Sequence, residues 1–564
     1  MSALCKELSV QGAAPRRKDA IRSILNRQSA LVGTAAALVM VAMTPSNALA
    51  ACASSLDPIV CSADANKHAG GISYSQTDDL SVIIEDGVEV EPTSGTDAVY
   101  LESYFGDVSL SSGATIVVDN GHAIDVYAYG NAVITQTGAI VSTGQSDEFG
   151  AAVRVYAYDG YADVSVADIT TSGYEEDALQ VESQWGSASV TVDGSLSTSG
   201  NNAWGVSVLA DDSADLTVTG DVSTLGNAST AIRVSAGGPA TVTVGGTVST
   251  AGSDSDGVEV YAVGDATVSL TDVSTQGYAS AAINIGTYAT WDQYVGGNVT
   301  LTAGAVSTAG NSSTAVYIDA QGTVTATLGN VSTLGRSSDA IVIDSDGYFS
   351  GEGDPYSVAA GISLTAGAIS TQGYDADGVD LYAQGGAVVV TLDSVSTQDD
   401  DSDAIYIETA STLTDVNGDY VVAAGDVTLT VAGDITTLGD DADAVDIHAD
   451  GTVNATLGNV STQGWDSGAI HIATYSNYGE AVDVTLTVGD VSTQGGESDA
   501  INLEADAVSG QTANIVLTAG NVSTAYLDSD AVTIEADGSV TATLGKVSTL
   551  GRSSDAIEID AYAQ

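Results

Sequence analysis

Basic residues are scarce in this chain. Only 12 of its 564 residues are Lys or Arg, against 74 Asp and Glu, and the formal net charge is −62. Six of the 12 basic residues lie in the first 50 positions, so the rest of the chain is almost without positive charge. A polyanion of this kind repels nucleic acid and anionic membrane surfaces, and it lacks the Lys/Arg clusters that grip phosphates. We therefore exclude a nucleic-acid partner.

Proline and cysteine are also rare, with six and three residues. The hydrophobic fraction is 44% and the mean hydropathy is +0.16. Because acid-rich disordered chains have few apolar residues, this composition argues against disorder. Val, Ile and Thr together with 63 glycines favour strands and turns over helices.

Residues 1–50 have the pattern of a secretory signal peptide. A basic region at 14–27 precedes a 14-residue apolar run at 30–43, and small residues follow at 46–50. The run is too short for a typical membrane-spanning helix, and no later segment has the length and apolarity to form one. We expect cleavage after Ala50 and export from the cytoplasm.

Two interpretations of Cys52 stay open. Residues 49–52 (LAAC) match a bacterial lipobox, which would place a lipid anchor on Cys52. However, Cys61 is the only other cysteine after residue 50, and two cysteines in an oxidising compartment are usually paired. A Cys52–Cys61 disulfide would staple the N-terminal end of the fold.

A tripeptide of the Val-Ser-Thr kind recurs along the chain with a basic period of about 25 residues and insertions in some copies. Its first residues, the repeat anchors, are Val141, Ile169, Leu196, Val222, Val248, Val273, Val306, Val331, Ile369, Val395, Ile435, Val460, Val491, Val522 and Val547. Each copy has three short segments of alternating polarity, separated by Gly, Ser and Asp turns. One copy cannot bury its apolar face alone, so the copies should stack in parallel around one core.

These repeats predict an all-β fold, a right-handed parallel β-helix solenoid of about 17 rungs with three short strands per rung of about 25 residues. The blades of a β-propeller need about 40–45 residues, which is more than the shortest copies have. We expect a signal peptide at 1–50, an N-terminal cap region at 51–80 and a β-helix repeat domain at 81–564.

The signal segment and the VSTxGxxSDAIxI–TVTxTLG rungs resemble the passenger region of bacterial autotransporters, the adhesin-like surface proteins of Gram-negative bacteria. The resemblance covers nearly all of residues 51–564, and the early cysteine pair fits it. It implies an exported rod at the cell surface or outer membrane, or outside the cell. Such proteins normally end in a membrane β-barrel whose pattern is not found here, so we expect outer-membrane association through a missing or separate barrel.

Carboxylates recur at one place in the repeat. The residue eight positions after the anchor is Asp in nine copies, namely Asp177, Asp256, Asp339, Asp377, Asp403, Asp443, Asp499, Asp530 and Asp555. Stacked carboxylates about 5 Å apart repel one another and need solvent, hydrogen bonds or a cation. One interpretation is turn chemistry, in which Asp accepts hydrogen bonds from peptide N–H groups two residues on. The other is Ca²⁺ binding, for which the candidate ligands are Asp254, Asp256, Asp344, Asp346, Asp401 and Asp403.

Equal offsets on adjacent rungs predict two further contacts. Arg233 and Glu259 should form an ion pair. Asp446 and His471 should face each other outside the core, either as an ion pair or, with His448, as a weak transition-metal site.

Insertions lengthen several copies between the DAIxI and TVT segments, so they should project along one edge. Their aromatic residues are Tyr288, Trp291, Tyr294, Tyr348, Tyr356, Tyr475 and Tyr478. Aromatic loops on one edge suit contact with carbohydrate or protein, and the other interpretation is that the rings pack back onto the rod.

The sequence has no Ser-His-Asp arrangement, phosphate-binding loop or Cys/His metal spacing. We expect a non-enzymatic surface rod that acts in adhesion, in aggregation or as a stalk. Its partners would be host or bacterial surface glycans or proteins, or other copies of itself. The alternative is a secreted β-helix enzyme acting on polysaccharides, either a lyase or a glycosidase with two carboxylates.

Overall fold

The chain divides into two units, residues 1–48 and residues 49–564. The computed structural model describes residues 52–53, 57–62, 68–144, 150–288, 296–347, 360–416, 419–476, 482–508 and 511–562. The predicted signal peptide lies outside these ranges. All regular structure within them is strand, and no described residue belongs to a helix that could cross a membrane.

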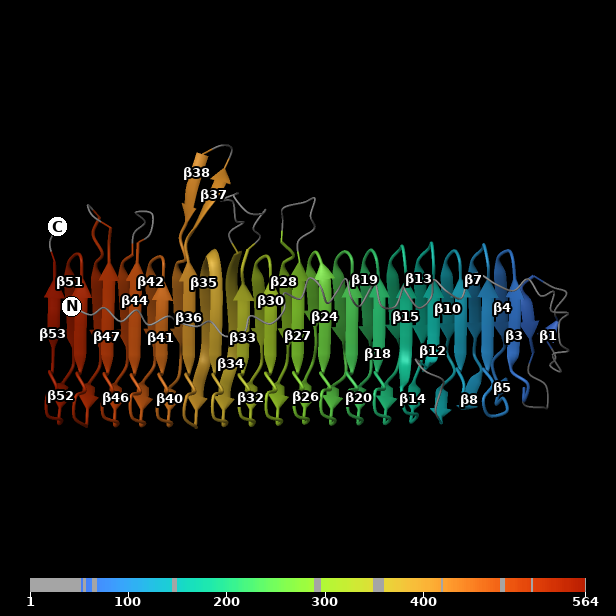
Figure 1. Cartoon of the computed structure of the whole chain (residues 1–564), viewed down its shortest axis with the longest axis horizontal. Coiled ribbons are helices and arrows are strands. Elements are labelled where there is room, and N and C mark those ends of the chain that lie inside the picture. Colours follow the sequence, from blue (N-terminus) through green and yellow to red (C-terminus); the bar gives the residue numbers. More distant parts are fainter. Residues whose placement is uncertain are drawn as a thin grey trace, which may run out of the picture. The chain divides into compact units, whose positions relative to one another are not determined.

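The second unit is a parallel β-helix of about 18 turns (Figure 1), which confirms the predicted solenoid and its approximate rung count. A regular turn has three strands, as in β22 (Ala240–Val244), β23 (Val248–Thr250) and β24 (Val258–Val263). The first two strands pair with their equivalents in the next turn to build sheet A, and the third builds sheet B.

The longer strands of sheet A are β4 (Leu80–Ile84), β7 (Val108–Ser112), β10 (Ala132–Gln136), β13 (Ala162–Val166), β16 (Ala188–Val192), β19 (Ala214–Val218), β22, β25 (Ala266–Ser269), β28 (Val299–Ala303), β31 (Val324–Leu328), β39 (Val427–Val431), β42 (Val453–Leu457), β45 (Val484–Val488), β48 (Ile515–Ala519) and β51 (Val540–Leu544). The second strands are β5 (Glu89–Val90), β8 (Thr115–Asp119), β11 (Ile140–Thr143), β14 (Ile169–Thr171), β17 (Leu196–Thr198), β20 (Val222–Thr224), β23, β26 (Val273–Thr275), β29 (Val306–Thr308), β32 (Val331–Thr333), β40 (Ile435–Thr437), β43 (Val460–Thr462), β46 (Val491–Thr493), β49 (Val522–Thr524) and β52 (Val547–Thr549). The strands of sheet B are β3 (Ile72–Gln76), β6 (Val99–Ser103), β9 (Ile124–Ala128), β12 (Gly150–Ala157), β15 (Glu176–Ser183), β18 (Val206–Ala210), β21 (Ile232–Ala236), β24, β27 (Ile283–Tyr288), β30 (Val316–Ala320), β33 (Ile341–Ser345), β36 (Ile405–Ala410), β41 (Val445–Ala449), β44 (Ile470–Tyr475), β47 (Ile501–Asp506), β50 (Val532–Ala536) and β53 (Glu558–Ala561).

Two strands run through the corners of their turns without a break. β34 (Ala360–Thr371) spans both strand positions of sheet A, and β35 (Val379–Thr397) spans all three positions. The insertion after β36 forms an antiparallel hairpin, β37 (Thr412–Val416) and β38 (Asp419–Ala423), which projects beyond the edge of the stack (Figure 1).

The core follows the two-residue period expected from the sequence. In β31, Val324, Ala326 and Leu328 are buried while Thr325 and Thr327 are exposed. The in-register pairing places aliphatic side chains over aliphatic side chains, so that one apolar cluster continues from Ile59 to Ala536. Burial of these side chains is the main force that holds each turn on its neighbours.

The VSTxGxxS part of the repeat is explained by a buried polar ladder at one corner. Thr224 Oγ1 donates to the Ser229 carbonyl oxygen at 2.5 Å, and Ser229 Oγ donates to the Gly200 carbonyl oxygen of the preceding turn at 3.1 Å. The Ser229 N–H donates to Ser255 Oγ in the next turn at 2.9 Å. The glycine is required because a Cβ at Gly226 would lie 1.8 Å from the Gly200 carbonyl oxygen.

At the N-terminal end, a disulfide joins Cys52 to Cys61, and the antiparallel pair β1 (Cys52–Ala53) and β2 (Ile59–Cys61) carries it. β2 pairs in parallel with β4, and β3 pairs in parallel with β6. The parallel stack therefore reaches back into the region 51–80 that the sequence suggested as a cap.

Candidate functional site

Sheet B presents two columns of side chains outside the core. The second and fourth residues of a regular strand point outward, as Asp446 and His448 do in β41. Because the strands are parallel and in register, like positions of successive turns stack. The first column contains Tyr406, Asp446, His471 and Asn502, and the second contains Glu408, His448, Ala473 and Glu504.

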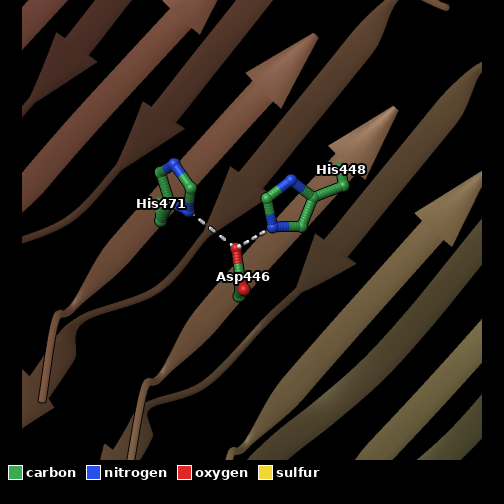
Figure 2. A group of neighbouring side chains, drawn as sticks. All are labelled: Asp446, His448 and His471. Carbon is green, nitrogen blue, oxygen red and sulfur yellow. Dashed lines mark hydrogen bonds and ion pairs between the residues drawn. The ribbon is translucent and has the colours of Figure 1, made fainter. Parts of the chain in front are cut away.

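Asp446, His448 and His471 meet on this face and form what we call the Asp-His-His cluster (Figure 2). His471 Nδ1 lies 2.9 Å from Asp446 Oδ1, and His448 Nε2 lies 3.2 Å from the same oxygen. The two imidazole rings are 5.2 Å apart and nearly perpendicular. The contact expected between Asp446 and His471 is therefore present, and His448 joins it. Within the described ranges, no other group of three or more His, Cys, Asp or Glu side chains brings its ligand atoms within 4.8 Å of one another.

The cluster is held together by charge as well as by geometry. Burial alone would raise the pKa of the Asp446 carboxyl, but the hydrogen bonds from His448 and His471 hold that pKa well below its usual range. The hydrogen bond to Asp446 raises the pKa of His448 against the opposing effect of burial, and the charges of Glu408 and Glu504 add to the increase. Asp446 is thus ionised, and the negative charges of Asp446, Glu408 and Glu504 favour a positive charge at His448.

The recurring aspartates at the corner before sheet B stack in a separate column, which we call the corner column. Their hydrogen-bond donors differ from those expected. Asp339 Oδ1 accepts a hydrogen bond from the N–H of Asp377 in the next turn at 3.0 Å. Asp377 Oδ1 accepts from the Asp403 N–H at 2.8 Å, and Asp403 Oδ1 accepts from the Asp443 N–H at 2.7 Å. Each carboxylate therefore accepts a hydrogen bond from a peptide N–H of the next turn rather than from one two residues further along the chain.

Burial and repulsion between neighbouring turns act on this column. They raise the pKa of Asp377 to about 8, with Asp339 and Asp403 as the repelling charges. Burial raises the pKa of Asp403 to about 6, and burial with the Asp403 charge raises that of Asp443 to about 7. The raised pKa values allow Asp377 and Asp443 to take up protons near neutral pH, which lowers the repulsion along the column.

The six candidate calcium ligands occupy separate places in this architecture. Asp256 and Asp403 are members of the corner column, and the Asp256 carboxylate accepts a peptide hydrogen bond from Ala281 at 2.8 Å. Asp254 and Asp401 have left-handed backbone conformations, with φ of 54° and 52°. Asp is one of the few residue types that adopt this conformation readily, which explains its recurrence there.

Asp344 and Asp346 lie together at the end of β33. Burial together with the neighbouring Asp346 raises the pKa of Asp344 to about 7, so the Asp344 carboxyl group is only partly charged at neutral pH. No described residue supplies a third carboxylate close enough to complete a ligand group with them. Calcium binding at the three aspartate pairs stays a prediction.

Of the aromatic insertion residues, the structure describes Tyr288 and Tyr475. Tyr288 is half-buried, and its hydroxyl lies 3.2 Å from the position that a Cβ on Gly286 would occupy, so its ring folds back over sheet B. Tyr475 is 39% exposed at the end of β44. Trp291, Tyr294, Tyr348, Tyr356 and Tyr478 lie outside the described residues.

Sheet B also carries contacts that the sequence analysis missed. Arg154 binds both carboxylate oxygens of Asp125 at 2.9 and 2.8 Å, and its guanidinium lies over the Tyr127 ring. Tyr100, Tyr127 and Tyr156 form a ladder with ring centroids 6.3 and 6.1 Å apart. Equal offsets would have aligned Arg154 with Asp125 and Tyr156 with Tyr127, but the early repeats lack a clear anchor.

The ion pair between Arg233 and Glu259 follows the prediction, with a separation of 3.3 Å, and Arg233 also lies over the Trp204 ring. Arg154 and Arg233, two of the few basic side chains of the stack, are thus bound to acidic and aromatic neighbours on sheet B.

Compared with protein-family models, with curated proteins and with solved structures, the chain matches none at a significant level.

Proposed function

We propose that this chain is an exported bacterial surface rod, a passenger region that acts in adhesion, in aggregation or as a stalk through many weak contacts. The observation that carries the proposal is the parallel stack itself, in which the same strands pair from turn to turn through the described parts of residues 59–561. At about 4.8 Å per turn, about 18 turns give an axis of about 85 Å.

The repeated outer surface supports this function. On sheet A the outward side chains repeat, since Thr302, Thr327 and Thr365 stack in successive turns, so a partner with repeated features meets the same chemistry several times. Several weak contacts on one scaffold give an avidity well above that of a single contact. The acid and tyrosine side chains of sheet B suit partners rich in hydroxyl groups or positive charge, such as surface glycans or proteins.

Export is supported by the secretory pattern of residues 1–50 and by the pairing of Cys52 with Cys61, since disulfides persist in oxidising compartments. Proteinase K added to intact cells that express the chain should degrade it, while a cytoplasmic marker stays intact. Protection of the chain in intact cells would contradict a surface location.

The register allows a direct test of the multivalent mechanism. Val222, Val248 and Val273 occupy equal positions, so deletion of residues 222–272 removes two complete turns and brings Val273 to the place of Val222. We expect the shortened protein to fold and to bind cells or glycan surfaces more weakly, without complete loss. Deletion of residues 306–330, one complete turn elsewhere in the stack and likewise without an insertion, is the matched control and should have the smaller effect.

A graded decrease supports repeated contacts along the rod. Complete loss from one deletion and no change from the other would show a single local site and refute the multivalent mechanism.

Incubation of the intact chain with a panel of polysaccharides distinguishes a binding rod from an enzyme. Binding without new reducing ends or unsaturated products is expected, and turnover would replace the proposal with a polysaccharide-active enzyme.

A further inference from the structure

We propose that Asp446, His448 and His471 form a binding site for a divalent transition-metal ion of the Zn²⁺ and Cu²⁺ class, held by two imidazole nitrogens and one carboxylate oxygen. The proposal depends on the local geometry of sheet B and is independent of the role of the rod.

The three ligand atoms already converge. Asp446 Oδ1 lies 2.9 Å from His471 Nδ1 and 3.2 Å from His448 Nε2. In a tetrahedral zinc site with bonds of about 2.0–2.1 Å, neighbouring ligand atoms lie about 3.3 Å apart. These two separations therefore need to change by only a few tenths of an ångström, and the two nitrogens lie within 4.8 Å of each other.

The ligand types select the metal. Imidazole suits Zn²⁺, Cu²⁺ and Ni²⁺, whereas Ca²⁺ and Mg²⁺ prefer sites made of oxygen ligands alone. The chain has 74 acidic residues but only four histidines, and two of these four meet at one carboxylate. This combination distinguishes the cluster from the carboxylates that cover the rest of the rod.

The backbone holds the ligands in place. Asp446 and His448 lie on β41 and His471 lies on β44, and these strands pair over five successive residues. Ligands on paired strands are held more rigidly than ligands on loops, so little order has to be gained when the metal binds. The Glu408 carboxyl group, next to His448 in the second column, adds negative charge beside the site.

The site is accessible from solvent. The side chains of His448 and His471 are 35% and 30% exposed, and that of Asp446 is 16% exposed. Three protein ligands leave a further coordination position for water, as in zinc sites that are open to solvent. Because the metal replaces protons on the imidazole nitrogens, its affinity should fall as the pH is lowered.

The next turn of each column supplies a substitution that the fold already accepts. His448→Ala introduces the residue type that follows His448 in its column at Ala473, and His471→Asn introduces the type that follows His471 in its column at Asn502. Asp380→Asn is the matched control, because Asp380 lies in the same column as Asp446 but two turns away.

The full chain, freed of metal with EDTA, is titrated with Zn²⁺ at pH 7.5 and followed by calorimetry. We expect the parent chain and Asp380→Asn to share one site that is absent from the His448→Ala/His471→Asn double variant. Each single histidine variant should bind Zn²⁺ at least about tenfold more weakly, because loss of even an indirect supporting residue costs about 10- to 100-fold in metal affinity. A millimolar excess of Ca²⁺ or Mg²⁺ should leave the site occupied by Zn²⁺.

Electron paramagnetic resonance of the chain with one equivalent of Cu²⁺ gives a readout that does not depend on stability. Hyperfine coupling to two imidazole nitrogens is expected in the parent and in Asp380→Asn, and it should disappear in the double variant. Equal Zn²⁺ affinity of parent and double variant, or a copper spectrum with oxygen ligands only, would overturn the proposal and leave the cluster as an ion pair.

Discussion

The serine ladder at the corner before sheet B provides a test of what holds successive turns together. Ser255 Oγ accepts a hydrogen bond from the Ser229 N–H at 2.9 Å and donates to the Gly226 carbonyl oxygen at 3.1 Å. Both serines are completely buried. Ser255→Ala therefore leaves the Ser229 N–H without its acceptor in a place that water does not reach, which costs about 1–3 kcal/mol.

The chain also contains the reverse case. Alanine takes the ladder position at Ala376, where it cannot offer an oxygen to the Ser338 N–H of the preceding turn. Ala376→Ser would supply that acceptor and a donor to the Gly335 carbonyl oxygen, as Ser402 Oγ does toward the Gly373 carbonyl oxygen at 3.1 Å. We expect this substitution to stabilise its turn by about 0.5–1.5 kcal/mol.

Amide hydrogen exchange measured by mass spectrometry is the appropriate assay, because a stack of turns opens locally and a single melting temperature averages over it. A cost of 1–3 kcal/mol corresponds to exchange about 5- to 150-fold faster in peptides that contain Ser229 and Gly226. Peptides around Ser338 should exchange more slowly in Ala376→Ser. If neither substitution changes exchange in the turn before it, the serine column does not couple the turns and the reasoning fails.

Three further substitutions or conditions test other parts of the stack. Gly252→Ala should sharply reduce the yield of folded chain, because the added Cβ would lie 1.8 Å from the Gly226 carbonyl oxygen. Resistance to proteolysis measures this yield, and unchanged resistance would contradict the prediction. Burial raises the pKa of Asp377 to about 8, so the native state holds a proton that the unfolded chain releases near pH 4. The contribution of this proton to the stability of the native state is complete below pH 4 and is lost as the pH rises to 8. Hydrogen exchange should accordingly be slower at pH 5 than at pH 8.5 after correction for the intrinsic rate, and Asp377→Asn should weaken that difference. Arg154→Ala leaves the buried Asp125 carboxylate unpaired and should cost about 3–5 kcal/mol, seen as faster exchange in β9 and β12, whereas an unchanged rate would show that the pair contributes nothing.

The repeat made most of the fold predictable. The two-residue alternation in Val324, Ala326 and Leu328 identifies the buried face, and the constant spacing of the anchors sets the register that pairs each strand with the next turn. The alternation and the spacing can both be read from short stretches of sequence, and parallel stacking of the turns is the arrangement that is consistent with both.

Other features could not be predicted because they depend on contacts between turns. The carboxylate of Asp339 binds a peptide 38 residues further along the chain, beyond any local turn motif. β35 passes through its corners as a continuous strand although Gly385 and Gly386 suggest a turn. Equal offsets aligned Asp446 with His471, and the two-residue period placed His448 beside them, but the approach of both rings to the same carboxylate oxygen follows only from the side-chain positions.

The direction of the interstrand hydrogen bonds has a mechanical consequence. They run along the stacking axis, so a pull on the two ends of the β-helix loads the interfaces between turns in series. The interfaces can then separate one at a time instead of being sheared together. Each turn of about 25 residues that detaches would add about 80 Å of extended backbone, whereas it occupied only about 4.8 Å of the axis in the stack. Under load the β-helix should therefore lengthen in small steps rather than break at a single force. In the proposed role as a stalk, this would let the attachment of a cell weaken gradually under flow.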